Sequence, residues 1–281
     1  MKIAPGRTLA VVGESGCGKT TLARMAAGLL KPDSGSISFK GRSLARWEKK
    51  GLRKNMQVVF QDADGSLNPN FSTRDLLLEP LLLHGLSRSE AEERLPELLS
   101  MVGLVPDLLH RHPHEMSGGQ RQRIGIARAM CLSPALVIAD EPVSALDRSI
   151  QAQILSLLQS FQSDSGVSYL YISHDLGSVR AVAHDVAVML GGLFVETGPA
   201  EDVFANPLHP YTKLLLADDN CSELPFKNYS VDLENRQGAE EGCPFAGCCN
   251  YCEPQCTKGV SGLIEVEPER SVRCRMVHRI A

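Results

Sequence analysis

Long apolar runs are absent from this sequence of 281 residues. A helix that crosses a bilayer needs about 20 consecutive apolar residues, and the longest candidate, Leu76–Leu83, is interrupted by Glu79 and Pro80. The opening segment Met1–Pro5 is too short and too polar for a signal peptide. These absences favour a soluble, cytosolic chain that has no membrane span of its own.

An excess of basic residues is absent as well, because 29 Lys and Arg are balanced by 33 Asp and Glu, giving a net charge of −4. Nucleic acid is therefore not expected as a partner. Disorder throughout is excluded, since 43% of the residues are hydrophobic and can build a sizeable core. The length suits one large domain, or one domain with an appendage.

Cysteine is scarce in the first 220 residues, which hold only Cys17 and Cys131, whereas the other 7 of the 9 cysteines come later. Thiols stay reduced in the cytosol, so a local cluster of them indicates a metal site rather than disulfides. The composition thus predicts two parts of the chain with different chemistry.

The hydrophobic pattern predicts an α/β fold with a mostly parallel sheet. Thr8–Val12 is an apolar run typical of a strand, and helical spacing follows over Thr20–Leu30. Two further apolar runs, Ala135–Ala139 and Tyr169–Ser173, are typical of strands buried on both faces. A helix is predicted between these two strands over Ile150–Phe161.

Weaker patterns complete the prediction of the fold. Ser36–Phe39 alternates like a short strand, and residues 74–102 are expected to be helical with breaks at Gly85 and Pro96. After Pro207 the chain is expected to be irregular and rich in cysteine.

A phosphate-binding loop is predicted after the first strand, where the sequence matches G-x-x-x-x-G-K-[ST] in full. Its glycines let backbone N–H groups turn toward phosphate oxygens, and the start of the next helix adds its positive dipole end. In this motif Lys19 reaches the β- and γ-phosphates and Thr20 binds Mg²⁺. A chance glycine loop is the alternative. The motif consists of Gly13, Glu14, Ser15, Gly16, Cys17, Gly18, Lys19 and Thr20.

Two carboxylates follow the apolar run Leu136–Ala139. Asp140 can lie against the Mg²⁺ shell, as the acidic partner of P-loop NTPases does, and Glu141 is then placed to polarise an attacking water. Alone, an Asp-Glu pair at a strand end is more often a solvated loop. The phosphate loop favours the functional interpretation.

The segment Met116–Gln120 reads Met-Ser-Gly-Gly-Gln and makes the pattern more specific. A serine and two glycines that open a helix predict a second anion site, with a simple Ser-capped helix start as the alternative. Together with the phosphate loop, the segment resembles the ATPase subunit of ABC transporters, whose signature loop is usually written L-S-G-G-Q. The resemblance implies that ATP lies between the phosphate loop of one subunit and the signature loop of another, formed here by Ser117, Gly118, Gly119 and Gln120.

Three further positions match this family, in its order, within residues 13–174. Gln61 matches the Q-loop glutamine, which touches Mg²⁺ and the water. Asp147 matches the D-loop aspartate, and His174 matches the switch histidine near the γ-phosphate. Each of these side chains alone would more often be structural.

The resemblance implies an ATPase in which Glu141 is the general base. Mg²⁺ is expected among Thr20, Gln61 and Asp140, and Thr21 is expected beside the nucleotide. The implied fold is that of a P-loop NTPase, with a RecA-like parallel sheet and a helical subdomain.

A finer resemblance points to the peptide and nickel import subfamily. It is carried by Gln61–Pro69, by Leu208–Lys213, and by Gly242–Phe245 ahead of the late cysteines. The implied organisation is a nucleotide-binding domain at 1–205, with its helical subdomain at about 72–132, and an extension at 206–281.

The implied function is ATP hydrolysis that energises import of peptides, nickel or other metal chelates, at the cytoplasmic face of the cell membrane. The implied partners are a second, related ATPase subunit, two integral-membrane permeases and, indirectly, an extracytoplasmic substrate-binding protein. A soluble ABC-type ATPase that docks on a non-transport enzyme complex is the alternative.

The late cysteines have a spacing that matches the C-terminal cysteines of this subfamily, where some members are thought to hold a [4Fe–4S] iron–sulfur cluster. Four thiolates suit such a cluster or a structural zinc ion, and thiols without metal are the third alternative. Cys248 and Cys252 leave the ligand set open, because Cys249-x2-Cys252 is also a reasonable metal-ligand spacing. The ligands that match best are Cys243, Cys249, Cys256 and Cys274.

The family usually has a β-rich stretch ahead of the phosphate loop, with an aromatic residue on which adenine stacks. Here twelve residues precede Gly13, and no aromatic residue occurs before Phe39. We therefore expect a short N-terminus without adenine stacking, which either a truncated chain or a genuinely shortened subunit would explain.

Overall fold

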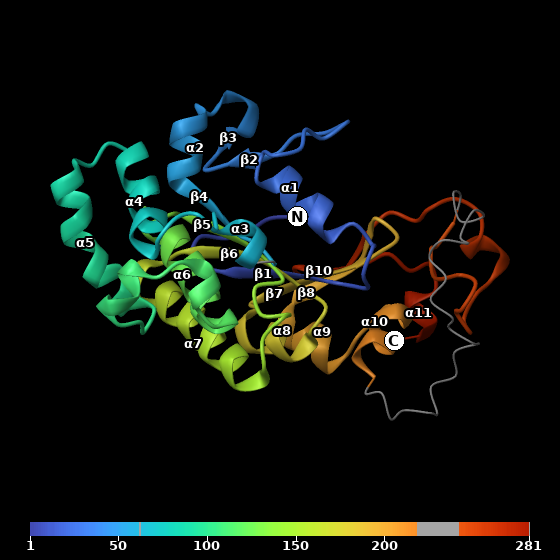
Figure 1. Cartoon of the computed structure of the whole chain (residues 1–281). Coiled ribbons are helices and arrows are strands. Elements are labelled where there is room, and N and C mark those ends of the chain that lie inside the picture. The colour runs from blue at the N-terminus through green and yellow to red at the C-terminus, as the bar shows by residue number, and fades with distance from the viewer. Residues whose placement is uncertain (62, 218–241, 281) are drawn as a thin grey trace. The chain divides into compact units, whose positions relative to one another are not determined.

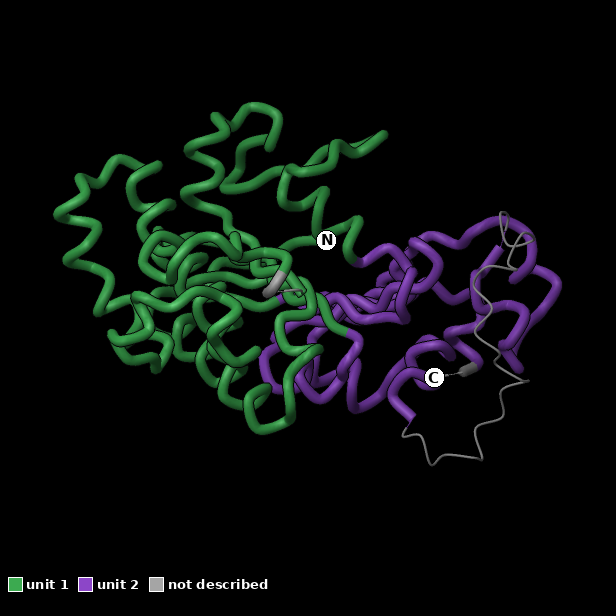
Figure 2. The backbone as a smooth tube through the Cα atoms, in the orientation of Figure 1, with its two compact units in different colours: residues 1–8, 20–173 green, residues 9–19, 174–281 purple. Residues whose placement is uncertain are grey.

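The computed structural model describes residues 1–61, 63–217 and 242–280. The chain forms two compact units, coloured separately in Figure 2. Unit 1 comprises residues 1–8 and 20–173, and unit 2 comprises residues 9–19 and 174–281. Within the described ranges, no helix combines the length and the apolar character needed to cross a membrane.

Unit 1 is built on three parallel strands: β4 (Met56–Val59), β5 (Leu136–Asp140) and β6 (Ser168–Ser173). Strand β5 is central, with Ile138 opposite Val58 on one side and Leu170 on the other. Every residue of β5 and β6 is buried, as expected for strands of a parallel sheet covered on both faces. The strands predicted at 135–139 and 169–173 are confirmed to within one residue.

The helices of unit 1 include a group of three, α4, α5 and α6, that contact one another (Figure 1). The long helix predicted at 150–161 is confirmed as α7. Helix α1 begins at Lys19, which is the last residue of the 9–19 segment of unit 2, and its other residues belong to unit 1. The bounds are α1 (Lys19–Ala26), α2 (Lys49–Asn55), α3 (Ala63–Ser66), α4 (Thr73–Leu83), α5 (Arg88–Met101), α6 (Gly118–Met130) and α7 (Arg148–Ser165), with 3-10 turns η1 (Leu44–Arg46), η2 (Pro106–His110) and η3 (Pro113–Glu115) and the hairpin β2 (Ser38–Phe39) and β3 (Arg42–Ser43).

The helix break predicted at Pro96 is wrong, because Pro96 lies inside α5. Proline removes one backbone hydrogen bond from a helix interior. The adjoining Leu95, Leu98 and Leu99 are buried, and their packing holds the helix together. The break predicted at Gly85 is confirmed, since this residue has a φ of +98° between α4 and α5.

Helix α1 is shorter than predicted, since it ends at Ala26 rather than at Leu30. Gly28 takes the left-handed conformation, with a φ of +66°. The N–H groups of Leu29 and Leu30 both donate to the carbonyl oxygen of Arg24, at 2.8 and 3.1 Å. A left-handed glycine with such backward bonds is a common way to end a helix.

Unit 2 contains a sheet in the order β1-β7-β8-β10-β9, in which β1 and β7 are parallel and the other neighbours antiparallel. Strand β1 belongs to this unit from Leu9 onward. The elements are β1 (Thr8–Val12), α8 (Leu176–Val182), β7 (Asp185–Leu190), β8 (Leu193–Pro199), α9 (Ala200–Ala205), α10 (Pro210–Leu216), η5 (Pro254–Cys256), β9 (Ile264–Glu267), β10 (Arg270–Val272) and α11 (Val277–Ile280).

The C-terminal segment is tied to β8 by a buried ion pair. Glu196 is fully buried, and its carboxylate lies 3.2 Å from the guanidinium of Arg270, which is 3% exposed. The same carboxylate accepts the backbone N–H groups of Leu208, at 2.9 Å, and of His209, at 2.8 Å. A buried carboxylate needs partners, and these bonds fix the start of α10. The chain after Pro207 also contains β9, β10 and α11, so it has more regular structure than its sequence indicates.

Candidate functional site

The predicted phosphate loop directly follows β1 in unit 2, and its backbone conformation requires glycine. Gly16 and Gly18 have φ values of +80° and +104°. Gly13 has a φ of +154°, and a Cβ at that position would lie 2.2 Å from the carbonyl oxygen of Met189 in β7. The start of the loop therefore packs on β7 where no side chain has room.

Lys19 turns its side chain back into this loop. Its ammonium donates to the carbonyl oxygens of Gly13, at 2.7 Å, and of Glu14, at 2.8 Å, and the residue is only 5% exposed. Ser15 and Gly16, at the tip of the loop, are exposed. A cation held beneath an exposed glycine turn is suited to an anionic ligand.

Cys17, also in the loop, is a packing residue rather than a reactive thiol. Burial raises its pKa, although the neighbouring charge of Lys19 acts in the opposite direction. A buried thiol with a raised pKa stays protonated at neutral pH. The thiol of Cys17 is therefore not expected to act as a nucleophile.

Two of the predicted catalytic side chains meet in unit 1. The side-chain amide of Gln61 donates to the Glu141 carboxylate at 2.9 Å, although 80 residues separate them. Glu141 has a φ of +49°, which is uncommon for a residue with a side chain, and its N–H is held by the carbonyl oxygen of Ile172 at 2.9 Å. Such strained residues concentrate at functional sites. Asp140, the last residue of β5 and the residue directly before Glu141, is buried.

The remaining ligands predicted for ATP and Mg²⁺ are distributed over both units. Thr20 and Thr21 lie in the first turn of α1 in unit 1, and both are exposed. His174 is exposed in unit 2, directly after β6. Asp175, which follows it, caps α8 by accepting the N–H groups of Gly177 and Ser178.

The predicted signature loop forms the start of α6 in unit 1. Ser117 accepts the N–H of Gln120 at 3.3 Å, and the Gln120 side chain accepts the N–H of Ser117 at 3.0 Å, which completes a capping box. A Cβ on Gly119 would lie 2.8 Å from Ile150 Cγ2 of α7. Both interpretations of this segment are compatible with the geometry, because a capped helix start also presents N–H groups.

Asp147, the predicted D-loop residue, caps α7 by accepting the N–H groups of Ser149, at 3.1 Å, and of Ile150, at 3.0 Å. The hydroxyl of Ser149 also donates to it at 2.6 Å and, with these N–H groups, lowers the pKa of the carboxyl. The position therefore has a structural role, and its contact with nucleotide stays a prediction.

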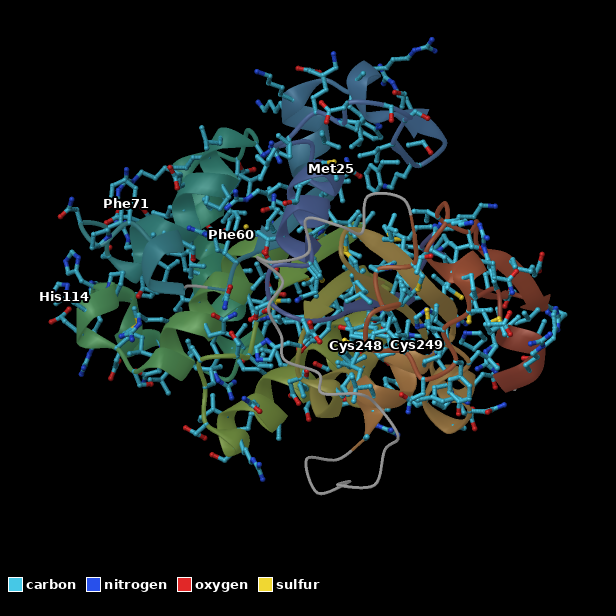
Figure 3. The ribbon with its side chains drawn as sticks, turned by 90° about the vertical axis from the view of Figure 1, so that its right-hand side faces the viewer. Met25, Phe60, Phe71, His114, Cys248 and Cys249 are labelled. Atoms are coloured by element: carbon cyan, nitrogen blue, oxygen red, sulfur yellow. The ribbon has the colours of Figure 1, made fainter. Side chains whose placement is uncertain are left out.

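Five of the late cysteines line a cavity in unit 2, of about 20 Å³. Figure 3 labels two of the late cysteines, Cys248 and Cys249, of which only Cys249 lines the cavity. Burial raises the pKa of Cys249 and that of Cys274 to about 11, and it also raises that of Cys243. The cysteines that line the cavity are Cys243, Cys249, Cys252, Cys256 and Cys274.

The expected iron–sulfur or zinc site finds no direct support in this geometry. Across residues 1–61, 63–217 and 242–280, no three His, Cys, Asp or Glu side chains converge as a group that could hold a metal ion. Cys221 lies outside the described residues.

Tyr211 is a residue of this region that sequence reasoning missed. It is fully buried in α10, and its hydroxyl accepts a hydrogen bond from the N–H of Glu14 in the phosphate loop, at 3.2 Å. The segment Leu208–Lys213 stands out in the sequence, but nothing in the pattern indicates that it reaches the phosphate loop.

Comparison with known proteins agrees with the motifs. Residues 1–144 match the family model described as "ABC transporter", and residues 195–256 match "Oligopeptide/dipeptide transporter, C-terminal region". The chain belongs to the ABC transporter family. As a member it is an ATP-hydrolysing subunit, and its P-loop fold is confirmed by the solved structures below.

Curated relatives of this ABC ATPase carry names of peptide transport proteins. Oligopeptide transport ATP-binding protein AppF of Bacillus subtilis is 42% identical, over 96% of this chain and 86% of its own length. Oligopeptide transport ATP-binding protein OppF of Escherichia coli is 41% identical, over 99% and 86%. Di/tripeptide transport ATP-binding protein DppF of Pseudomonas aeruginosa is 43% identical, over 97% and 87%.

Two solved structures share its fold. The cbiO1 protein from Clostridium perfringens, part of the ABC transporter complex cbiONQ, has a TM-score of 0.66 and 31% identity, over 73% of this chain and 82% of that one. The ATP-binding cassette MJ0796, solved as a dimer after hydrolysis with ADP and Pi, has a TM-score of 0.64 and 26% identity, over 71% and 88%.

Proposed function

We propose that this ABC ATPase energises the import of peptides, acting as a peripheral subunit at the cytoplasmic face of the membrane. The bond between Gln61 and Glu141 carries the assignment of the catalytic residues. It orients a carboxylate at a strained strand end, next in sequence to the buried Asp140. A general base fixed by a neighbouring side chain is a common feature of hydrolytic sites.

The residues have distinct roles in this proposal. Lys19 and the N–H groups of the phosphate loop bind the phosphates, and Glu141 accepts the proton of the attacking water. Thr20, Gln61 and Asp140 would hold Mg²⁺, whose charge stabilises the transferring phosphoryl group. His174 contacts the γ-phosphate. Ser117–Gln120 and Asp147 serve the nucleotide of the partner ATPase, and ATP binding closes the pair.

The variant Glu141→Gln tests the catalytic assignment. We expect it to bind ATP, to lower turnover at least about 100-fold because the general base is lost, and to trap the closed pair with its partner ATPase. Steady-state turnover and size-exclusion chromatography with ATP would measure both effects. Glu92→Gln is the control, because Glu92 pairs with Arg74 and Arg88 on the surface of α4 and α5. Near-normal turnover of Glu141→Gln would contradict the assignment.

Permease partners fit a groove in unit 1 of about 260 Å³. Its lining includes Leu29, Phe60 and Leu83, which are 52%, 42% and 65% exposed, together with Arg53 and Arg128. Phe60 directly precedes Gln61 and is labelled in Figure 3. An exposed apolar patch rimmed by charge is typical of an interaction site, and we propose that a cytoplasmic helix of the permease occupies it.

Co-purification tests this docking surface. With co-expressed permeases, Leu83→Glu is expected to lose most of the bound permease while ATP binding by the free subunit is unchanged. Val105→Glu is the matched control, since Val105 is 60% exposed but does not line the groove. Equal retention of permease by the two variants would exclude the groove. A wild-type subunit that retains no permease would favour a soluble ATPase docked on a non-transport complex.

The cargo proposal rests on the relatives' names, which specify oligopeptides and di- or tripeptides. Uptake by the reconstituted complex, with its substrate-binding protein, would be measured for labelled peptides and for nickel chelates. We expect ATP-dependent uptake of peptides. Uptake of nickel alone would overturn this choice in favour of the other branch of the subfamily.

We also propose that the cysteines around the cavity bind a [4Fe–4S] cluster, with zinc as the alternative. The support is the soft chemistry of five thiols that line one space. Anaerobic purification, a visible spectrum and metal analysis test it. Iron, sulfide and a brown colour are expected. Colourless protein that contains neither iron nor zinc would exclude both the cluster and the zinc site.

A further inference from the structure

The buried tyrosine of α10 reaches the phosphate loop from the C-terminal extension. Tyr211 accepts a hydrogen bond from the N–H of Glu14 at 3.2 Å, although 197 residues separate the two. Both residues belong to unit 2. The tyrosine is fully buried, so its hydroxyl is shielded from water and its position is set by packing.

The bond acts on the same peptide group that contacts Lys19. Glu14 supplies the N–H and Gly13 the carbonyl of one planar trans peptide, so the two groups point in opposite directions. The N–H donates to Tyr211, and the carbonyl accepts the Lys19 ammonium at 2.7 Å. The orientation of this peptide thus links the tyrosine hydroxyl to the charge of Lys19.

The Cys-rich segment, residues 242–256, holds the tyrosine in place. The ring of Phe245 packs edge-on against Tyr211, with ring centroids 5.8 Å apart. The backbone N–H of Tyr211 donates to His209 Nδ1 at 3.0 Å. His209 is itself fixed by its N–H bond to the buried Glu196.

A second contact runs from the same segment toward the other end of the loop. A Cβ on Gly191 would lie 3.3 Å from Pro244 Cβ, so these residues are in close contact. The neighbouring Gly192 donates its N–H to the carbonyl oxygen of Cys17 at 3.0 Å. Successive residues of the Cys-rich segment, Pro244 and Phe245, therefore support the loop at two points.

We infer that Tyr211 is a positioning residue for the phosphate loop, through which the C-terminal extension sets the affinity for ATP. The inference rests on the proposed function, because it requires the loop to bind the phosphates of ATP. It assigns the extension a part in nucleotide binding, which its sequence does not indicate.

The variant Tyr211→Phe keeps the ring and removes only the hydroxyl. In the full-length protein we expect ATP to bind about three- to tenfold more weakly, the range that one neutral hydrogen bond supplies. Turnover at saturating ATP is expected to change less than about twofold, because Glu141 is untouched. Hydrogen exchange at the Glu14 amide is expected to accelerate. Calorimetric binding, a KM and kcat analysis and amide exchange would measure these effects.

Tyr169→Phe is the matched control. Tyr169 is also buried, and its hydroxyl donates to the carbonyl oxygen of Leu158 at 3.0 Å, within unit 1. It should show a comparable loss of stability to urea with unchanged ATP affinity. If both variants weaken ATP binding equally, or if neither does, the positioning role is overturned.

Two further variants separate this inference from the proposed function. Lys19→Ala should abolish ATP binding, and its failure to do so would refute the proposed phosphate site. If Lys19→Ala abolishes binding while Tyr211→Phe binds as the wild type does, only the positioning role fails. Phe245→Leu, which keeps an apolar side chain but loses the ring contact, should weaken ATP binding in the same direction as Tyr211→Phe, and a wild-type affinity would exclude the Cys-rich segment from this role.

Discussion

Two glycine-containing segments, the phosphate loop ahead of α1 and the signature loop at the start of α6, are held in different ways. The signature loop is held mainly by its own residues, because Ser117 and Gln120 cap each other three positions apart. The phosphate loop has the bonds of its own Lys19, but it is held in addition by distant residues of unit 2. Met189 leaves no space above Gly13, Gly192 bonds to Cys17, and Tyr211 bonds to Glu14.

The difference shows which loop can be perturbed from elsewhere. A loop fixed by a capping box keeps its shape as long as its helix is intact. A loop fixed by residues nearly two hundred positions away depends on the packing of the whole C-terminal extension. We therefore expect the phosphate loop to respond to distant changes and the signature loop mainly to local ones.

The largest effect is expected from Gly13→Ala. A Cβ there would lie 2.2 Å from a backbone oxygen of β7, which cannot move without disturbing the sheet. We expect the free energy of unfolding to fall by at least about 3 kcal/mol, as for other severe backbone clashes, with loss of ATP binding. Urea unfolding and ATP titration would measure both.

Gly16→Ala is the control for that prediction. Gly16 also has a positive φ, of +80°, but nothing lies within 4 Å of the position of its Cβ. Only conformational strain is added, so a cost of about 1–2 kcal/mol is expected. Equal costs for the two variants would show that the contact with β7 does not hold the loop.

Acidification should loosen the distant support of the phosphate loop. Burial lowers the pKa of His209 to about 3, whereas an unfolded histidine titrates near about 6.5. Between these pH values the unfolded chain binds one more proton than the folded chain does. The stability that the neutral, buried His209 contributes is therefore complete above about pH 6.5 and is lost as the pH falls. The expected slope is about 1.4 kcal/mol per pH unit.

Urea unfolding between pH 4.5 and 7.5 would test this expectation with His209→Asn. Asparagine can still accept the N–H of Tyr211 and cap α10, but it does not titrate. The pH slope should decrease by about one proton. His114→Asn is the control, because His114 is exposed in unit 1 (Figure 3). The same decrease in both variants would contradict a special role for the buried histidine.

A smaller and strictly local effect is expected from Ser117→Ala. Removing an N-cap hydroxyl costs about 1 kcal/mol, and the ATP affinity of the phosphate loop should not change. Ser117→Asn should restore most of the stability. Urea unfolding and ATP titration of the isolated subunit would measure both quantities, and weaker ATP binding by Ser117→Ala would contradict the local character of this loop.

The same contrast explains which features could be predicted from sequence. The strands, the glycine loop and the capped helix at Ser117 follow from residues within a few positions of one another, and the structure contains each of them. The apolar spacing through Leu29 predicts a longer α1, whereas the left-handed Gly28 follows the end of the helix at Ala26. Proline predicts a break at Pro96, and the burial of Leu95, Leu98 and Leu99, which holds α5 together, depends on tertiary packing that the local sequence does not show.

The features that could not be predicted are those that join distant segments. The bond between Gln61 and Glu141 spans 80 residues, and that between Glu14 and Tyr211 spans 197. The motifs indicate that Gln61 and Glu141 serve one reaction, but not that they touch. For Tyr211 the sequence offers only the segment Leu208–Lys213, which resembles the import subfamily, since the hydrogen bond depends on how α10 packs in the folded unit 2, where it contacts β8.

The smallest effect concerns two glycines of α6. Gly125 has nothing within 4 Å of the position of a Cβ, so Gly125→Ala should stabilise the helix by about 0.5–1 kcal/mol. At Gly119 the same gain is opposed by Ile150, whose methyl group would lie 2.8 Å from the new Cβ. Since a side chain can move, we expect Gly119→Ala to be neutral or destabilising by up to about 1 kcal/mol. Urea unfolding distinguishes the two variants. An equal gain in stability in both would mean that α7 does not constrain the signature loop.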